Sequence, residues 1–121
     1  MKNKPFHKRL GFALTGIAEG WRNERSFRTH AFSAVAAIAA LCILRPAPIW
    51  WAVIILTIAL ILSAELVNAA FEGLIDHLHP DIHPRIRIVK DMAAGAVLIA
   101  ALGSLVIAAL LAIDLRWPGM N

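Results

Sequence analysis

The chain alternates between long apolar runs and short charged segments. Apolar runs cover residues 31–44, 49–64 and 92–113. The third run contains no charge over twenty-two residues, about 33 Å of helix, which is long enough to cross a bilayer. The first run is too short alone, so its helix must begin near Glu24, and the helix of the second run must continue to about Asp76. The pattern predicts transmembrane helices over 24–45, 48–76 and 90–114.

A different pattern precedes the first run. Apolar residues recur there at spacings of four, four, three and four, with charged residues between them. This periodicity predicts an amphipathic helix over 5–22, lying in the membrane interface with its apolar face dipped into the acyl region. Three glycines in this segment would leave room for a lipid or for a closely packed helix. The apolar positions are Phe6, Leu10, Leu14, Ile17 and Trp21.

Composition supports the membrane assignment. Hydrophobic residues make up 60% of the 121 residues and charged residues only 17%, too few to cover the surface of a small water-soluble domain. We therefore expect a single domain over 1–121, an all-α integral membrane protein with one surface helix and three spans. Cys42 is the one cysteine, so no intramolecular disulfide can form, and no secretory signal peptide is evident.

The basic residues are distributed unevenly along the chain. Ten of the twelve lysines and arginines lie before the first apolar run or in the segment 77–90, and only Arg45 and Arg116 lie on the other side. This asymmetry predicts a cytoplasmic N-terminus and a cytoplasmic 77–90 loop. The net charge of +4 is thus explained by anionic lipid headgroups, and we expect no nucleic-acid partner.

Four polar residues interrupt the second predicted span. Glu65, Asn68, Glu72 and Asp76 follow one another at spacings of three, four and four, so they share one stripe of a helix. A carboxylate beside hydrocarbon is costly and usually has a partner or a task. Glu65, the deepest, could take a proton from a lipid alcohol.

Other polar residues are expected at the same membrane depth. Carboxylates hold Mg²⁺ and lysine pairs with phosphate, so a Mg²⁺–nucleotide site is the chemistry that this set favours. The chain has no phosphate-binding loop of the GxxxxGK[ST] or GxGxxG type. Three histidines near the second loop do not have the spacing of a usual zinc site, and His30 is expected to be interfacial. The additional polar residues are Glu24, Lys90 and Asp91, and the three histidines are His77, His79 and His83.

Three motifs carry a family resemblance. They are Asn23-Glu24-x-x-Phe27-Arg28, then Glu65-x-x-Asn68-x-x-x-Glu72-x-x-x-Asp76, then His83 with Lys90-Asp91-Met92-Ala93-Ala94-Gly95-Ala96-Val97-Leu98. Together they resemble the small bacterial membrane diacylglycerol kinases and the related undecaprenol kinases, over almost the whole chain.

The resemblance implies a homotrimeric enzyme of the bacterial cytoplasmic (inner) membrane that transfers the γ-phosphate of ATP to diacylglycerol, with its active site on the cytoplasmic side. It implies that Glu65 is the general base and that Glu24 and Glu72 hold Mg²⁺. The lipid would be bound near Gly16 and Trp21. The implied nucleotide contacts are Glu24, Asn68, Glu72, Asp76, His83, Lys90 and Asp91.

The sequence departs from the family pattern at two places, and two alternatives stay open. Phe12 stands where some members have Tyr near the adenine, and Pro5 stands where some have Arg, so Lys8 or Arg9 would substitute. His30 resembles the undecaprenol kinase branch. A more distant alternative is a non-enzymatic membrane protein whose acidic residues bind ions.

Overall fold

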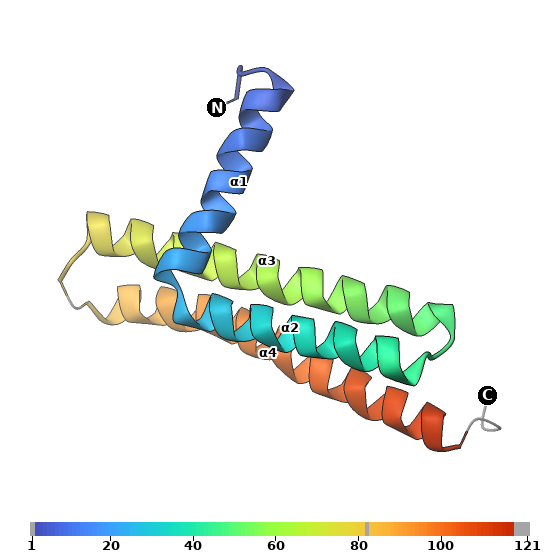
Figure 1. The fold of residues 1–121 in the computed structure, drawn as a ribbon. Helices are drawn as coiled ribbons and strands as arrows, with labels where there is room; N and C mark the ends of the chain where they lie inside the picture. Colours follow the sequence, from blue (N-terminus) through green and yellow to red (C-terminus); the bar gives the residue numbers. More distant parts are fainter. Residues whose placement is uncertain (1, 82, 118–121) are drawn as a thin grey trace.

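The computed structural model describes residues 2–81 and 83–117; Met1, Ile82 in the predicted second loop, and residues 118–121 lie outside the described part. The described chain is all-helical, with no strand, as the sequence predicts. Figure 1 shows the helices in chain order. They are α1 (Phe6–Asn23), α2 (Arg25–Leu44), α3 (Pro48–Leu78) and α4 (Pro84–Arg116).

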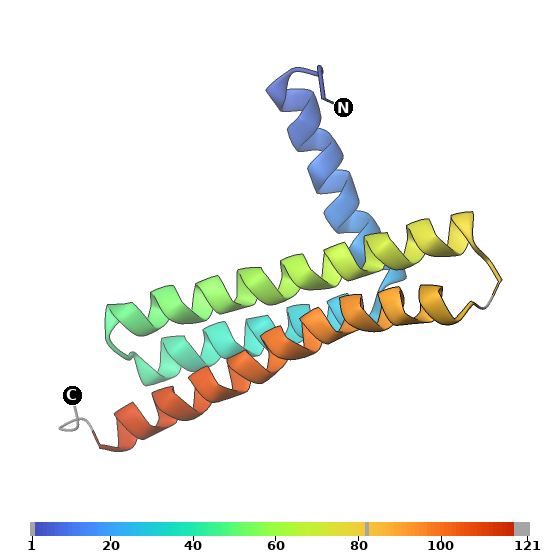
Figure 2. The ribbon, with the colours of Figure 1, turned by 180° about the vertical axis from the view of Figure 1, so that it is seen from behind.

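Helix α3 is the centre of the arrangement. It packs against α4 along much of its length, against α2, and against the C-terminal part of α1. Within the described residues, the backbones of α2 and α4 do not come into contact with each other. Helix α1 leaves the side of this bundle at a steep angle and extends away from it (Figures 1 and 2).

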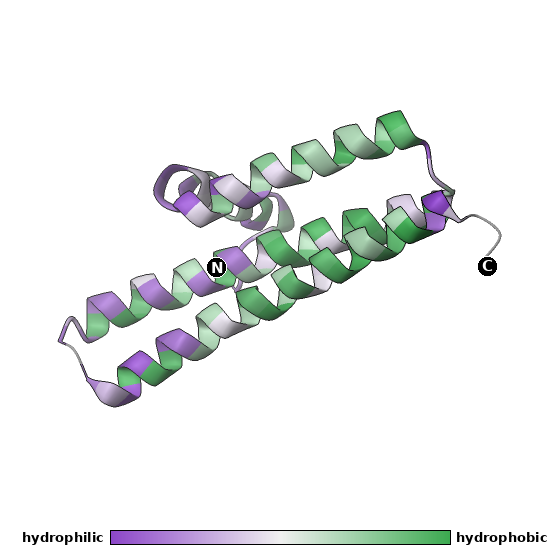
Figure 3. Cartoon of the chain, turned by 90° about the horizontal axis from the view of Figure 1, so that it is seen from below, coloured by the Kyte–Doolittle hydropathy of each residue, from purple (hydrophilic) through white to green (hydrophobic). Residues whose placement is uncertain are grey.

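The three predicted spans are confirmed. Helices α2, α3 and α4, with 20, 31 and 33 residues, are each long and apolar enough to cross a membrane. The last two are about 46 and 50 Å long, more than the roughly 30 Å of hydrocarbon. Figure 3 shows that their polar turns gather at the end that carries the α3–α4 loop, opposite the C-terminus. That end therefore extends toward water.

Few side chains are buried within the chain. The buried apolar residues are Phe27, Leu41, Ile61 and Leu111, while most other large apolar side chains face outward. In water such a surface would drive aggregation, but in a bilayer the lipid tails or neighbouring helices cover it. That α1 lies in the interface remains a prediction.

The α3–α4 loop is shorter than the predicted 77–90 segment. Helix α3 ends at Leu78, and α4 begins at Pro84 rather than at Lys90. Proline suits the first turn of a helix because its φ is already helical and its missing N–H would have no partner there. The His83 Nδ1 accepts a hydrogen bond from the backbone N–H of Arg85 at 3.1 Å and caps the helix. The prediction of the helix start at Lys90 was wrong because it gave too much weight to the two prolines as helix breakers.

At the other end of the bundle, a tight turn joins α2 to α3. Arg45 adopts the left-handed conformation (φ 50°, ψ 55°), and its N–H bonds to the carbonyl of Leu41 at 2.9 Å. Pro48 then starts α3. The Trp50 Nε1 donates a hydrogen bond to the Asp114 Oδ2 at 2.9 Å, which ties α3 to the end of α4.

Helix α1 is fixed to the bundle at its C-terminal end. Gly20 is its one buried residue, and a Cβ placed there would run into the side chain of Leu66 on α3. The Arg28 guanidinium donates hydrogen bonds to the carbonyls of Trp21 (2.7 Å) and Arg22 (3.0 Å), so it closes the bend between α1 and α2. These contacts fix where α1 leaves the bundle.

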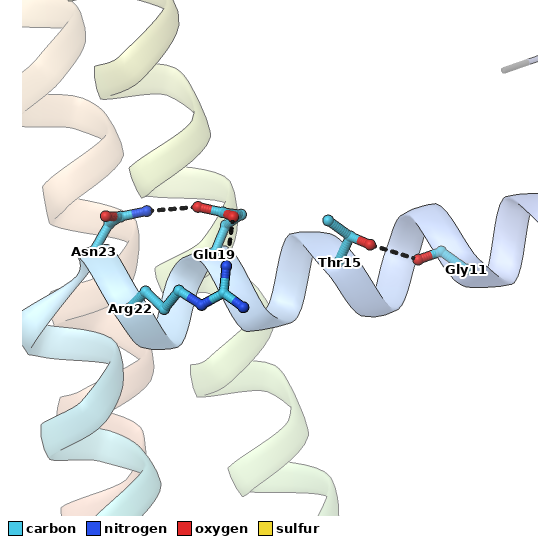
Figure 4. Close-up of polar contacts among 5 residues, drawn as sticks. All are labelled: Gly11, Thr15, Glu19, Arg22 and Asn23. Atoms are coloured by element: carbon cyan, nitrogen blue, oxygen red, sulfur yellow. Dashed lines mark hydrogen bonds and ion pairs between the residues drawn. The ribbon is translucent and has the colours of Figure 1, made fainter.

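The side-chain hydrogen bonds within α1 are local. Figure 4 shows that Arg22 and Asn23 both turn back to Glu19, at 3.1 and 2.8 Å, and that the Thr15 hydroxyl bonds to the carbonyl of Gly11. A Cβ at Gly11 or Gly16 would meet nothing within 4 Å. Of the three glycines predicted to leave room for a neighbour, only Gly20 packs against another helix of this chain.

Candidate active site

Glu65 is the one buried charged residue of the described chain. Its side chain is only 7% exposed and lies in the apolar part of α3. The carboxylate Oε1 is 2.6 Å from the Nδ1 of His30 on α2, within ion-pair distance, although the contact lacks the alignment of a hydrogen bond. A carboxylate at this depth is costly without a partner, and His30 supplies that partner.

His30 also borders an apolar cavity. The cavity, of about 380 Å³, lies between α2, α3 and α4. Its few polar side chains bond to their own helices: the hydroxyls of Ser33, Thr57 and Ser104 donate to backbone carbonyls. Apart from His30, its wall is therefore apolar and hydroxyl-bearing, without charge. The remaining lining residues are Ala34, Ala37, Ile54, Ile58, Ile61, Leu62, Ala101, Leu105 and Ala108.

Asn68 and Glu72 lie one and two turns beyond Glu65 on α3. The Asn68 Oδ1 is buried and accepts no hydrogen bond within the described structure. A buried acceptor without a donor is costly, so a donor from outside the described chain is expected to satisfy it. Glu72 is half-buried, and its charge acts on Lys90 across the α3–α4 interface.

A polar cleft of about 140 Å³ is found where α3 and α4 meet the loop. The Lys90 Nζ lies 2.7 Å from the Asp76 Oδ1, and His83 and Arg87 line the same cleft. Asp76, His83 and Lys90, three of the predicted nucleotide contacts, are thus brought together. The cleft thus holds two basic side chains, Arg87 and Lys90, and two carboxylates, Asp76 and Asp81. Basic side chains in an open cleft can bind a phosphate-bearing ligand. The other lining residues are His79, Pro80 and Ile86.

The remaining predicted site residues lie outside the Glu65–His30 pair and outside the cleft of Asp76 and Lys90. Glu24, extended between α1 and α2, is half-buried, and its carboxylate does not cap α2. Asp91 and Gly16 are exposed. Trp21 packs its ring against Phe32 of α2 at a centroid distance of 5.6 Å. One chain therefore assembles part of the predicted set.

The predicted Mg²⁺ ligands are the carboxylates of Glu24 and Glu72. In residues 2–81 and 83–117, no group of three or more His, Cys, Asp or Glu side chains is placed to hold a metal ion. Mg²⁺ in nucleotide sites commonly takes only one or two protein carboxylates, with phosphate and water completing its shell. Glu24 and Glu72 are half-buried, and neither carboxylate has an ion pair or hydrogen bond within the described residues, so both fit that donor set.

Two residues at these sites were not predicted from the sequence. His30, which is predicted to be interfacial, contacts Glu65, and the sequence did not predict this contact. Arg87, one of the ten basic residues that predict the orientation in the membrane, lines the cleft of Asp76 and Lys90. The spacing of three between Arg87 and Lys90 puts them on one helix face and was the available signal for Arg87. The partner of Glu65 could not be found without the pairing of α2 and α3.

These features define a small multi-pass membrane protein. Its polar groups extend from the apolar interior to the end of the bundle that carries the α3–α4 loop and faces water, called the wet end below. The family profile described as prokaryotic diacylglycerol kinase matches residues 11–112. The chain belongs to this family.

Named relatives support the assignment. A diacylglycerol kinase of Synechocystis sp. is 37% identical over 97 residues, which are 79% of this chain and 55% of that protein. The chain thus spans about half the length of that relative. An undecaprenol kinase of Bacillus subtilis is 37% identical over 106 residues, 88% of this chain and 86% of that protein. A diacylglycerol kinase of Escherichia coli K12 is 30% identical over 93 residues, 77% and 76% of the two chains.

Proposed function

We propose that the protein is a lipid kinase that transfers the γ-phosphate of ATP to the hydroxyl of diacylglycerol and forms phosphatidic acid. The observation that carries this proposal is the position of Glu65, a buried carboxylate in the apolar part of α3. The same helix reaches the polar cleft of Asp76 and Lys90 at the end of the bundle that carries the α3–α4 loop. A lipid alcohol reaches Glu65 through hydrocarbon, and a nucleotide reaches the cleft from water. Membership of the family supports the same reaction.

Glu65 is the general base of the proposed reaction. As the alcohol O–H bond breaks, the proton moves to the Glu65 carboxylate and the alcohol oxygen attacks the γ-phosphorus. The bond from that phosphorus to the bridging oxygen of the β-phosphate breaks, and ADP leaves with the electron pair. Asn68 lies one turn away, and its buried Oδ1 accepts a donor from the bound reactants. Most of the rate enhancement then comes from positioning and charge neutralisation.

The nucleotide is bound at the wet end of α3 and α4. Lys90 and Arg87 neutralise phosphate charge, while Asp76 holds Lys90 in place. Glu24 and Glu72 hold Mg²⁺, with His83 and Asp91 as further nucleotide contacts. When bound, the ion neutralises charge on the β- and γ-phosphates. Glu65 and Glu72 are about 10 Å apart along the helix axis, a separation that the triphosphate can bridge.

Further parts of the proposal concern assembly and location. The exposed apolar faces of the three spans support a homotrimer in the bacterial cytoplasmic membrane. Ten of the twelve basic residues lie before the first apolar run or in the segment 77–90, which supports a cytoplasmic N-terminus and active site. Gly16 and Trp21, on the helix that leaves the bundle close to Glu65, hold the lipid headgroup region.

Undecaprenol kinase is the second candidate function. The match to the Bacillus subtilis undecaprenol kinase covers 88% of this chain, and His30 resembles that branch. Both activities would use the same base and the same nucleotide. The alcohols differ, because the hydroxyl of diacylglycerol lies beside two ester groups, whereas that of undecaprenol ends an isoprenoid chain.

The proposal is tested with purified protein, ATP and Mg²⁺ in mixed micelles. Glu65→Gln is expected to reduce lipid phosphorylation by at least about 100-fold, because the amide has the same shape but cannot accept the proton. Glu72→Gln is expected to raise the Mg²⁺ concentration needed for half-maximal rate. Substantial activity in Glu65→Gln would show that Glu65 is not the general base. An unchanged Mg²⁺ dependence in Glu72→Gln would show that Glu72 is not a Mg²⁺ ligand.

A further inference from the structure

His30 is the residue in direct contact with the proposed base. Its Nδ1 lies 2.6 Å from the Glu65 Oε1, and the imidazole is 28% exposed where Glu65 is 7% exposed. The contact is not aligned as a hydrogen bond, and this nitrogen has no hydrogen-bond partner among the described residues. The pair joins α2 to α3, so the position of the carboxylate depends on the packing of these two helices.

We infer that His30 is the positioning residue of the lipid kinase: its Nδ1–H holds the Glu65 carboxylate in one rotamer, ready to accept the proton of the lipid alcohol. This inference rests on the proposed function. Glutamate has three side-chain torsions, and a carboxylate on a helix in hydrocarbon otherwise turns toward any available water or cation. A fixed N–H beside one oxygen leaves the second oxygen to receive the proton.

The geometry separates this role from that of the nucleotide residues. Glu65 and Asp76 are about 16 Å apart along α3, so a change at His30 acts on the chemical step and not on the ATP cleft. His30 also forms part of the wall of the 380 Å³ cavity. A purely structural imidazole would fill space in that wall, and an apolar side chain of similar size would replace it.

Two substitutions distinguish the roles. His30→Leu fills the cavity wall and removes the donor. His30→Asn places an amide N–H at the same number of bonds from the backbone as Nδ1, so it restores the donor with a smaller side chain. His77→Leu is the matched control, since His77 is an exposed histidine of α3 outside the proposed machinery. Circular dichroism and size-exclusion chromatography in detergent check that each variant is folded.

The expected result is a fall in kcat of about 10- to 100-fold in His30→Leu with an unchanged KM for ATP, and recovery of most of that loss in His30→Asn. His77→Leu is expected to have the wild-type kcat. Wild-type kcat in His30→Leu would overturn the inference. Equal loss in folded Leu and Asn variants would overturn it as well, because the donor would then not be the property that matters.

An activity-independent measurement distinguishes this failure from failure of the proposed function. The infrared difference between wild type and Glu65→Gln isolates the carboxyl bands of Glu65. These bands are expected to shift in His30→Leu and to be restored in His30→Asn; unchanged bands overturn the contact. If the wild type phosphorylates no lipid, or if Glu65→Gln stays active, the proposed function fails, and the infrared result still decides whether His30 holds Glu65.

Discussion

Gly20 offers the sharpest structural test, because it fixes where α1 meets α3. A Cβ at this position would run into the side chain of Leu66, the residue next to Glu65. Gly11, on the same helix, faces open space. The substitutions Gly20→Ala and Gly11→Ala therefore differ in one property, the overlap with Leu66.

The expected magnitudes follow from this difference. In a helix, Gly→Ala contributes about 1 kcal/mol of stability, which applies to both variants. Only in Gly20→Ala must the end of the Leu66 side chain move, and a side chain that leaves its preferred rotamer costs about 0.5–1.5 kcal/mol. Gly20→Ala is thus expected to be about 0.5–1.5 kcal/mol less stable than Gly11→Ala. Because the displaced side chain neighbours Glu65, Gly20→Ala is also expected to lower the kcat of lipid phosphorylation.

The assay is unfolding in mixed micelles with increasing sodium dodecyl sulfate, followed by circular dichroism. A third variant, Leu66→Ala, completes a double-mutant cycle: in its background the cost of Gly20→Ala is expected to disappear. Equal stability of Gly20→Ala and Gly11→Ala, or a cost that persists without the Leu66 side chain, would refute the packing of α1 on α3 at this point.

Three further predictions concern the two ends of the bundle. Arg45→Gly is expected to stabilise the protein by about 0.5–1 kcal/mol in the same unfolding assay, because Gly adopts the left-handed conformation of this turn without strain; destabilisation would contradict that turn. Trp50→Phe removes the hydrogen bond to Asp114 and is expected to cost about 1 kcal/mol while leaving lipid phosphorylation unchanged, since the bond lies at the end opposite the site. Activity falling in parallel would argue against this separation. The pair of Asp76 and Lys90 is exposed, so Asp76→Asn is expected to leave the unfolding midpoint unchanged but to raise the KM for ATP; a lowered midpoint with an unchanged KM would make the pair structural.

The spans were predictable because hydropathy and length are local properties of the chain. The runs 31–44, 49–64 and 92–113 lie within α2, α3 and α4. The start of α4 was harder to predict from the sequence, because a proline such as Pro84 can follow the end of one helix or begin the next. The histidine cap that favours the second outcome depends on a side-chain rotamer.

The site was predictable along a helix but not between helices. The spacing of Glu65, Asn68 and Glu72 places them on one face of α3 without further information. The contact of His30 with Glu65 depends on the register of α2 against α3, which no local pattern specifies. The close approach of Gly20 to Leu66 is unpredictable for the same reason, since three glycines in α1 have similar surroundings in sequence.

The central claim is that this chain phosphorylates a lipid alcohol, and diacylglycerol in particular. The most direct test follows phosphate from γ-labelled ATP into lipid with the purified wild-type protein, given diacylglycerol and undecaprenol separately at equal mole fraction in the same micelles. The account predicts Mg²⁺-dependent labelling of both alcohols, with the higher kcat/KM for diacylglycerol. A higher value for undecaprenol would assign the protein to the second candidate function, and labelling of neither lipid by intact, folded protein would contradict the account.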